Sequence, residues 1–229
     1  MKRFFLVLFL VCFFWSSGTW AGEQLSYTTA QTIINNARSI LAETTASHWV
    51  DTSMLIWLNM GVQDISSKTG CLDTSYRVVL TSGISEYAIS SGTSFFGIKT
   101  ALYQSGTSTF KGLSQGNPQS TGHAAPTIGE PVYWYKNGNS IGIYPYPATS
   151  GNTVYALLSR RPISIGLTGT VPIPAKYDNT LTFWVIAMAF LEDKNTFGKS
   201  FMDLYREDLK FYVPSYELWP FKKVEEIIK

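Results

Sequence analysis

The chain has 229 residues, of which 45% are hydrophobic and 15% are charged, and its formal net charge at pH 7 is +2. This length suits one well-cored domain, or one core with an inserted lobe, and the composition is that of a folded protein. The nearly balanced charge offers no basic stripe to neutralise a row of phosphates, which argues against direct nucleic-acid binding.

Residues 1–21 form a signal-like apolar leader. A basic start precedes an uninterrupted apolar run over residues 4–15, and a Thr-x-Ala ending closes at Ala21. The run is shorter than the ~20 residues of a membrane span, and the pattern fits a cleaved secretory signal. A retained anchor and a misassigned start are the competing interpretations. Cys12 lies in the leader, so Cys71 is left alone and we predict no disulfide and no cysteine metal site.

Two amphipathic helices are predicted next, within residues 22–72. Thr28 and Thr29 offer caps for the first helix, whose apolar residues follow helical spacing as far as Ile40 and Leu41. Residues 51–53 offer caps for the second helix, whose apolar residues are Leu55, Leu58, Val62 and Ile65, with Met54 and Trp57 beside them. Gly70 stands where a left-handed C-terminal residue belongs.

Residues 73–174 predict an inserted antiparallel β lobe, because short alternating segments are separated by Gly, Ser, Asn and Pro. Residues 76–90 indicate a hairpin that turns at Ser82-Gly83, and residues 106–127 indicate a long polar loop. Residues 132–147, VYWYKNGNSIGIYPYP, predict two aromatic arms about a tight turn at Asn137-Gly138.

The chain returns to helix over residues 175–213. Asp178 or Asn179 is the expected cap of a strongly apolar helix, which Gly198 should end. A further helix then carries a stripe made of Phe201, Leu204, Tyr205, Leu209 and Tyr212. The fold class predicted is α+β: a helical bundle from the N- and C-terminal segments, 22–72 and 175–213, with the inserted antiparallel β lobe and an extended C-terminal docking tail over 214–229.

The sequence shows no constellation typical of catalysis. Its two histidines, His48 and His123, have no nucleophile elbow and no H-E-x-x-H spacing beside them. The β lobe holds few carboxylates, namely Asp73, Glu86 and Glu130. A paired-carboxylate glycosidase stays open as an alternative, although these groups equally suit strand-edge charges. We predict no catalytic residue, no cofactor and no metal, and hence no enzyme.

Aromatic residues give the stronger signal, because they favour places where protein surfaces meet. An ordinary two-sided β core is the alternative explanation for the hairpin aromatics. The strand end at Arg160-Arg161 offers inter-subunit ion pairs, although solvated charges are more common. The residues predicted to bind partners are Tyr133, Trp134 and Tyr135 in the hairpin, Arg160 and Arg161 at the strand end, and Tyr216, Trp219, Phe221 and Lys222 in the tail.

Several segments, taken in order, resemble the head–tail connector (adaptor) proteins of tailed bacteriophages. They are YTTAQTIINNARSILAE, DTSMLIWLNMGVQDIS, GEPVYWYKNGNSIGIYPYP, SRRP and VPIPAKYDNTLTFWVIAMAFLEDKNTFGKSFMDLYREDL. The hallmarks are Gly129, Pro131 and Tyr133, the strand end Ile143-Tyr144-Pro145, and Ile173-Pro174 with Tyr177 before a helix. The resemblance covers about Thr28 to Leu209.

This resemblance implies a structural virion protein without enzymatic activity. Its subunits would form a homo-oligomeric ring, a dodecamer in this family, between the portal protein and a tail nozzle or tail-completion protein. Double-stranded DNA would pass through the channel without sequence-specific binding. The C-terminal segment would dock on the portal, which makes Tyr216, Trp219 and Phe221 its anchors.

The leader departs from the family pattern, because such adaptors belong to the phage neck and assemble in the host cytoplasm. A secreted or periplasmic β-rich module that binds carbohydrate or protein is therefore the alternative. In that case the hairpin around Trp134 would be the stacking platform for a sugar.

Overall fold

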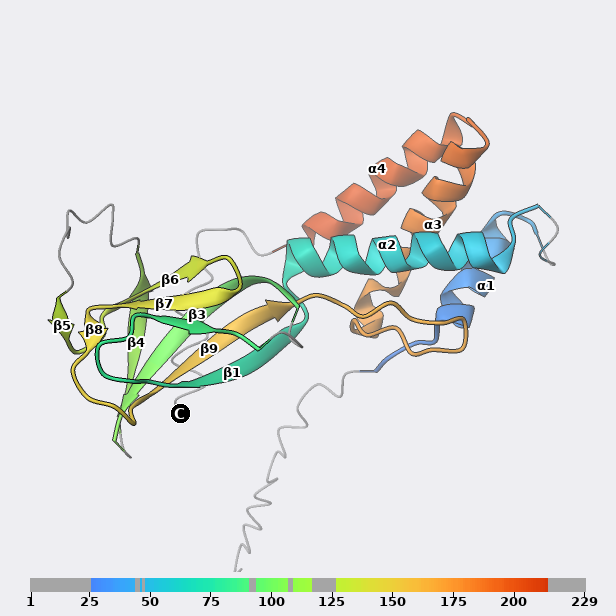
Figure 1. Ribbon diagram of the computed structural model, residues 1–229. Helices are drawn as coiled ribbons and strands as arrows, with labels where there is room; N and C mark the ends of the chain where they lie inside the picture. Colours follow the sequence, from blue (N-terminus) through green and yellow to red (C-terminus); the bar gives the residue numbers. More distant parts are fainter. Residues whose placement is uncertain are drawn as a thin grey trace, which may run out of the picture.

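The computed structural model describes residues 26–43, 46, 48–90, 94–106, 109–116 and 127–213. Within them the chain forms four α-helices on one side and nine strands on the other, so the class is α+β as predicted (Figure 1). Two separate hydrophobic cores hold these parts together. The leader over 1–21 and the tail over 214–229 lie outside the described residues. No described helix is long and apolar enough to cross a membrane.

The helices come from both ends of the described chain and share one core. They are α1 (Ala30–Ile40), α2 (Asp51–Thr69), a short 3-10 turn η1 (Ala175–Tyr177), α3 (Asp178–Glu192) and α4 (Phe197–Lys210). Apolar residues at helical spacing bring these segments together, since each helix buries its stripe against the others. The core includes Ile33, Ile34, Leu58, Val62, Ile65, Leu181, Val185, Ile186, Tyr205 and Leu209.

The helix ends agree with the sequence in part. Thr29 is the N-cap of α1, where its hydroxyl accepts from the N–H of Thr32 at 3.3 Å, and Gly70 closes α2 with a φ of 59°. The other predicted caps are wrong. Val50 precedes α2 without a side-chain cap, and Asp51 is already helical. Asp178 is the first residue of α3, where its carboxylate accepts from the Thr28 hydroxyl at 2.5 Å.

Two apolar residues and one glycine differ from the prediction in their burial or in their place in a helix. Ile40 is 53% exposed and Leu204 is 48% exposed, so neither belongs to a core stripe. Gly198 lies buried in the first turn of α4 and does not end α3. An added Cβ there would stand 2.8 Å from Cγ of Leu191, so glycine lets the two helices approach. The chain turns instead at Lys194, whose φ is 55°.

The strands form one seven-stranded mixed sheet and one two-stranded sheet. The strands are β1 (Asp73–Val79), β2 (Glu86–Ala88), β3 (Phe95–Ser105), β4 (Thr109–Gln115), β5 (Ile128–Gly129), β6 (Tyr133–Asn137), β7 (Ser140–Tyr144), β8 (Tyr146–Pro147) and β9 (Thr153–Arg160). The order in the large sheet is β1-β9-β3-β4-β6-β7-β2, and β5 pairs with β8. Trp134, Ile141, Ile143, Val154 and Leu158 lie in its core.

The topology corrects three expectations for the lobe. The sheet is not purely antiparallel, because β4 pairs with β6 in parallel, as β5 does with β8. Residues 76–90 form no hairpin, since β1 pairs with β9 and β2 pairs with β7. The expected loop over 106–127 contains strand β4. Long-range pairing decides all three, and local alternation carries no information about it.

The hairpin of β6 and β7 forms as predicted, with its turn one residue later, at Gly138-Asn139 between Asn137 and Ser140. Gly138 has a φ of 54°, which glycine adopts without strain.

The lobe joins the helices where α2 runs into β1 (Figure 1). The N–H of Arg160 donates to the carbonyl of Leu72 at 2.7 Å, which keeps the outgoing chain beside the incoming one. The Lys99 ammonium donates to the carbonyl of Gly70 at 2.6 Å and also bonds the Asp73 carboxylate. A cation at the C-terminal end of α2 is favourable for the helix dipole.

Candidate assembly surfaces

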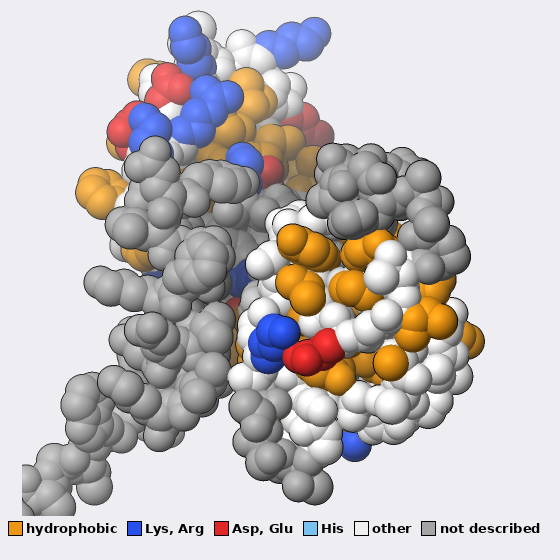
Figure 2. Space-filling view, turned by 90° about the vertical axis from the view of Figure 1, so that its left-hand side faces the viewer, with side chains coloured by type: hydrophobic (Ala, Val, Ile, Leu, Met, Phe, Trp, Pro, Cys, Tyr) orange, Lys and Arg blue, Asp and Glu red, His pale blue; other side chains and the backbone are white. Residues whose placement is uncertain are grey.

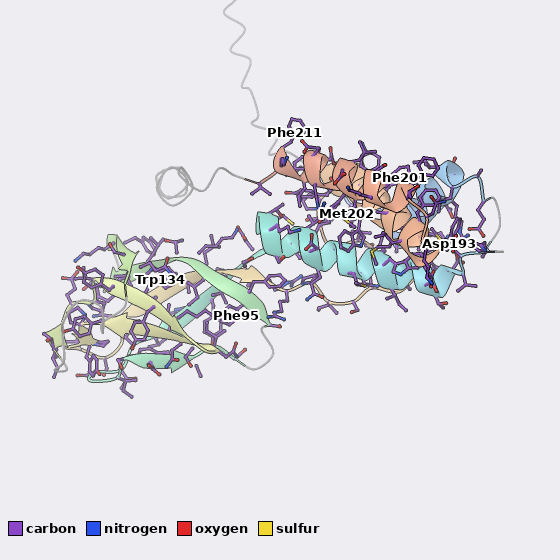
Figure 3. All side chains as sticks on the ribbon, turned by 90° about the horizontal axis from the view of Figure 1, so that it is seen from above. Phe95, Trp134, Asp193, Phe201, Met202 and Phe211 are labelled. Carbon is purple, nitrogen blue, oxygen red and sulfur yellow. The ribbon has the colours of Figure 1, made fainter. Side chains whose placement is uncertain are left out.

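The aromatic hairpin packs largely into its own lobe. Trp134 is 2% exposed and points into the core (Figure 3). On the opposite face of β6, the Tyr135 ring lies directly over Gly142, where no side chain stands in its way. The Tyr135 hydroxyl donates to the Glu86 carboxylate at 3.4 Å. Burial raises the pKa of Tyr135, and the Glu86 carboxylate raises it further. The buried Trp134 ring therefore cannot serve as a stacking platform for a sugar.

The predicted arginines lie at the end of β9, near the joint with the helices. The Arg161 guanidinium lies 5.0 Å from the centre of the Phe96 ring. Nearby, the Lys136 ammonium lies 5.1 Å from the centre of the Phe95 ring and donates to the Phe96 carbonyl at 2.8 Å. Arg160 and Arg161 form no ion pair with any residue that the structure describes. Their role in subunit contacts stays a prediction.

The far end of the lobe carries exposed hydrophobic side chains. Figure 2 shows them gathered on the end that faces away from the helices. Ile128 in β5 is 65% exposed and Val132 is 37% exposed. Lys111 and Glu130, paired at 3.0 Å, are both about half exposed. This end, called here the lobe tip, carries exposed apolar side chains around one Lys–Glu pair, and such a surface is typical of a contact site.

A second apolar surface lies on α2. It is a groove of about 360 Å³ lined by Ile56, Asn59, Met60, Gln63, Pro162, Ile163 and Ser164, called here the α2 groove. Ile163 is 75% exposed, Ile56 61% and Met60 46%. Asn59 builds its wall: the side-chain amide donates to the Ile165 carbonyl at 3.1 Å and accepts from the Ile165 N–H at 2.8 Å. This pair of bonds fixes the segment after β9 against the helix.

The sequence did not predict the α2 groove, because the strongest pattern in α2 is its buried apolar stripe. Ile56 and Met60 are four residues apart and lie on a different face of the helix from the stripe. This pair of apolar residues was the sequence signal for a second apolar surface on α2. The tail residues Tyr216, Trp219, Phe221 and Lys222 lie outside the described residues, as does His123. Tyr133 is half-buried beside Gly116.

Each candidate catalytic group that the structure describes has its own hydrogen-bonding or ionic partner. His48 lies at the surface, with its Nε2 2.9 Å from a carboxylate oxygen of Asp193 at the end of α3. Glu86 accepts from the side-chain amide of Asn137 at 3.0 Å, and Glu130 pairs with Lys111. In the described part of the chain no cluster of His, Cys, Asp and Glu has the geometry to hold a metal ion. Burial raises the pKa of Cys71, which keeps its thiol protonated.

One family model matches this chain. It is described as "SU10 adaptor protein" and covers residues 28–211, which is most of the chain. No curated protein matches.

Proposed function

Since the chain belongs to the SU10 adaptor protein family of phage head–tail adaptors and is thus a structural virion protein, we propose that it forms a ring between portal and tail. Identical subunits of the ring would bind the portal protein on one side and a tail nozzle or tail-completion protein on the other. The family match supports a structural role without catalysis.

The observation that carries the proposal is the presence of two separate apolar surfaces on one chain. The lobe tip and the α2 groove each expose large aliphatic side chains that water solvates poorly. A ring subunit must bind its two neighbours through two different surfaces, of which the α2 groove can supply one, and the lobe tip then stays open to another partner. Further surfaces are needed for the portal and for the phage tail. Tyr216, Trp219 and Phe221, in the C-terminal segment of this chain, are our candidates for portal anchors.

The charge distribution fits a passage for DNA. The net charge is +2, and many described cations already have an anionic partner in the chain, such as Lys68 with Asp64 at 2.6 Å. A channel of such subunits attracts phosphates weakly, so DNA moves through it without being held. Assembly in the host cytoplasm is part of the same proposal.

Co-expression with the portal protein tests this proposal. Size-exclusion chromatography with light scattering should give one particle that contains the portal and a ring of this chain. Truncation after Val213 should remove portal binding and leave the folded chain intact, because helices and lobe end before that residue. A chain that stays monomeric beside a well-formed portal contradicts the proposal.

A further inference from the structure

No exposed residue of α1 is charged, although the paired Arg38 and Glu43 line a recess beside Asn35 and Ser39. Its exposed residues are Thr32, Asn35, Asn36, Ser39 and Ile40. The single charged residue of this helix, Arg38, is turned inward and is 6% exposed. It is held there by Glu43 at 2.6 Å and Asp51 at 2.7 Å. This surface is called here the α1 face.

The exposed side of α2 has the same character over most of its length. From Thr52 to Gln63 the helix contains no charged residue, and its exposed large side chains are Ile56 and Met60. The charged residues of α2 stand at its two ends, where Asp51 pairs with Arg38 and Asp64 pairs with Lys68. The α2 groove is thus lined by uncharged residues alone.

The outer side of α4 shows what a solvent-facing helix of this protein looks like. It exposes Lys199, Asp203, Arg206, Glu207 and Lys210. Two ion pairs, Arg206 with Asp203 at 3.1 Å and Lys210 with Glu207 at 2.6 Å, lie along it. Charged side chains also crowd the helical part in Figure 2. Among the described helices, α1 and α2 therefore differ from α4 in having exposed faces without charge.

We propose that the α1 face of one copy of this chain packs into the α2 groove of the next copy. An uncharged groove selects an uncharged partner, because a charge buried there would lose its hydration without gaining an ion pair. The partner face must also differ from the groove, since identical faces meeting each other close a dimer and only unlike faces propagate a ring. The α1 face meets both conditions and supplies Ile40, 53% exposed, as its apolar contact. This step rests on the ring proposed above.

A photo-cross-linker in place of Met60 identifies what occupies the groove. Particles are assembled with the portal from equal amounts of ¹⁵N-labelled and unlabelled chain, each carrying a benzophenone amino acid at position 60. We expect cross-linked peptides that contain residues 32–42 and join labelled to unlabelled chain. The same group in place of Glu207 on α4 is the control and should give no such product. A cross-link to the portal, to a tail protein or to residues 1–25 or 214–229 overturns the inference.

A charge placed in the groove gives the second arm. Met60→Glu should lower the fraction of chain assembled into rings at least about tenfold, because the new carboxylate would be buried unpaired between copies. Ser200→Glu adds the same charge to α4 and should leave assembly unchanged. Both side chains are solvent-exposed in the single chain, so neither variant is expected to unfold it. Full assembly of the Met60→Glu chain refutes the packing and leaves the ring intact, whereas an unsubstituted chain that never assembles removes the ring as well.

Discussion

Arg38→Leu should destabilise the helical part severely. Arg38 is the inward cation of α1, and its guanidinium makes three charge-assisted bonds: to Glu43 at 2.6 Å, to Asp51 at 2.7 Å and to the Trp49 carbonyl at 2.7 Å. The Glu43 side chain is 8% exposed, so removal of the arginine breaks a buried ion pair while the carboxylate stays in place. Breaking a buried pair in this way costs about 3–5 kcal/mol. That is a large share of a total stability of about 5–15 kcal/mol.

The assay is urea unfolding followed by circular dichroism, with the free energy of unfolding extrapolated to water. The control is Arg206→Leu, which breaks an exposed pair with Asp203 and should cost no more than about 1 kcal/mol. Arg38→Leu combined with Glu43→Leu should recover part of the loss, because both charges of the buried ion pair are then removed together. A loss below about 1 kcal/mol in the single Arg38 variant would contradict a stabilising role for this buried ion pair.

Two further predictions concern the contact of α2 with α3 and α4. Tyr205→Phe removes the hydrogen bond to Asp64 and should cost about 1–3 kcal/mol. Burial raises the pKa of Tyr205, and the Asp64 carboxylate raises it further. The free energy of unfolding should therefore fall as the pH rises past about 10, the ordinary pKa of tyrosine. Tyr205→Phe should make this fall with pH smaller, as measured by denaturant titrations at several pH values. Gly61→Ala would place a Cβ 2.7 Å from Cδ1 of Trp184, and a net loss of about 1–2 kcal/mol is expected after the helix-propensity gain of alanine. Gly112→Ala, with no atom within 4 Å of its new Cβ, should change the unfolding free energy by less than about 0.5 kcal/mol, and an equal effect in both glycine variants would contradict the packing argument.

The sequence predicts the helices well because their signals are local. Thr29 and Gly70 sit at helix ends where capping geometry demands such residues, and helical spacing identifies the buried stripes. The exceptions have physical reasons. Ile40 and Leu204 fit the spacing at the edge of a stripe, and exposure depends on what the rest of the fold places there. Gly198 resembles a helix stop, yet it serves close packing against Leu191.

The strand pairing was not accessible from local pattern. Alternation identifies a strand such as β3, but the partner of a strand is decided by contacts far along the chain. β1 and β2 are neighbours in sequence and lie at opposite edges of the sheet order. One wall of the α2 groove is held by Asn59, which binds the backbone of Ile165, a residue more than one hundred positions later. The sequence of α2 alone therefore does not predict the wall of the groove.

The most direct test of the adaptor role is electron cryomicroscopy of the neck of the intact phage particle. The adaptor role predicts a closed ring of this chain between the portal ring and the tail, with DNA or an open channel along its axis. A neck in which another protein fills that position, and from which this chain is absent, would contradict it.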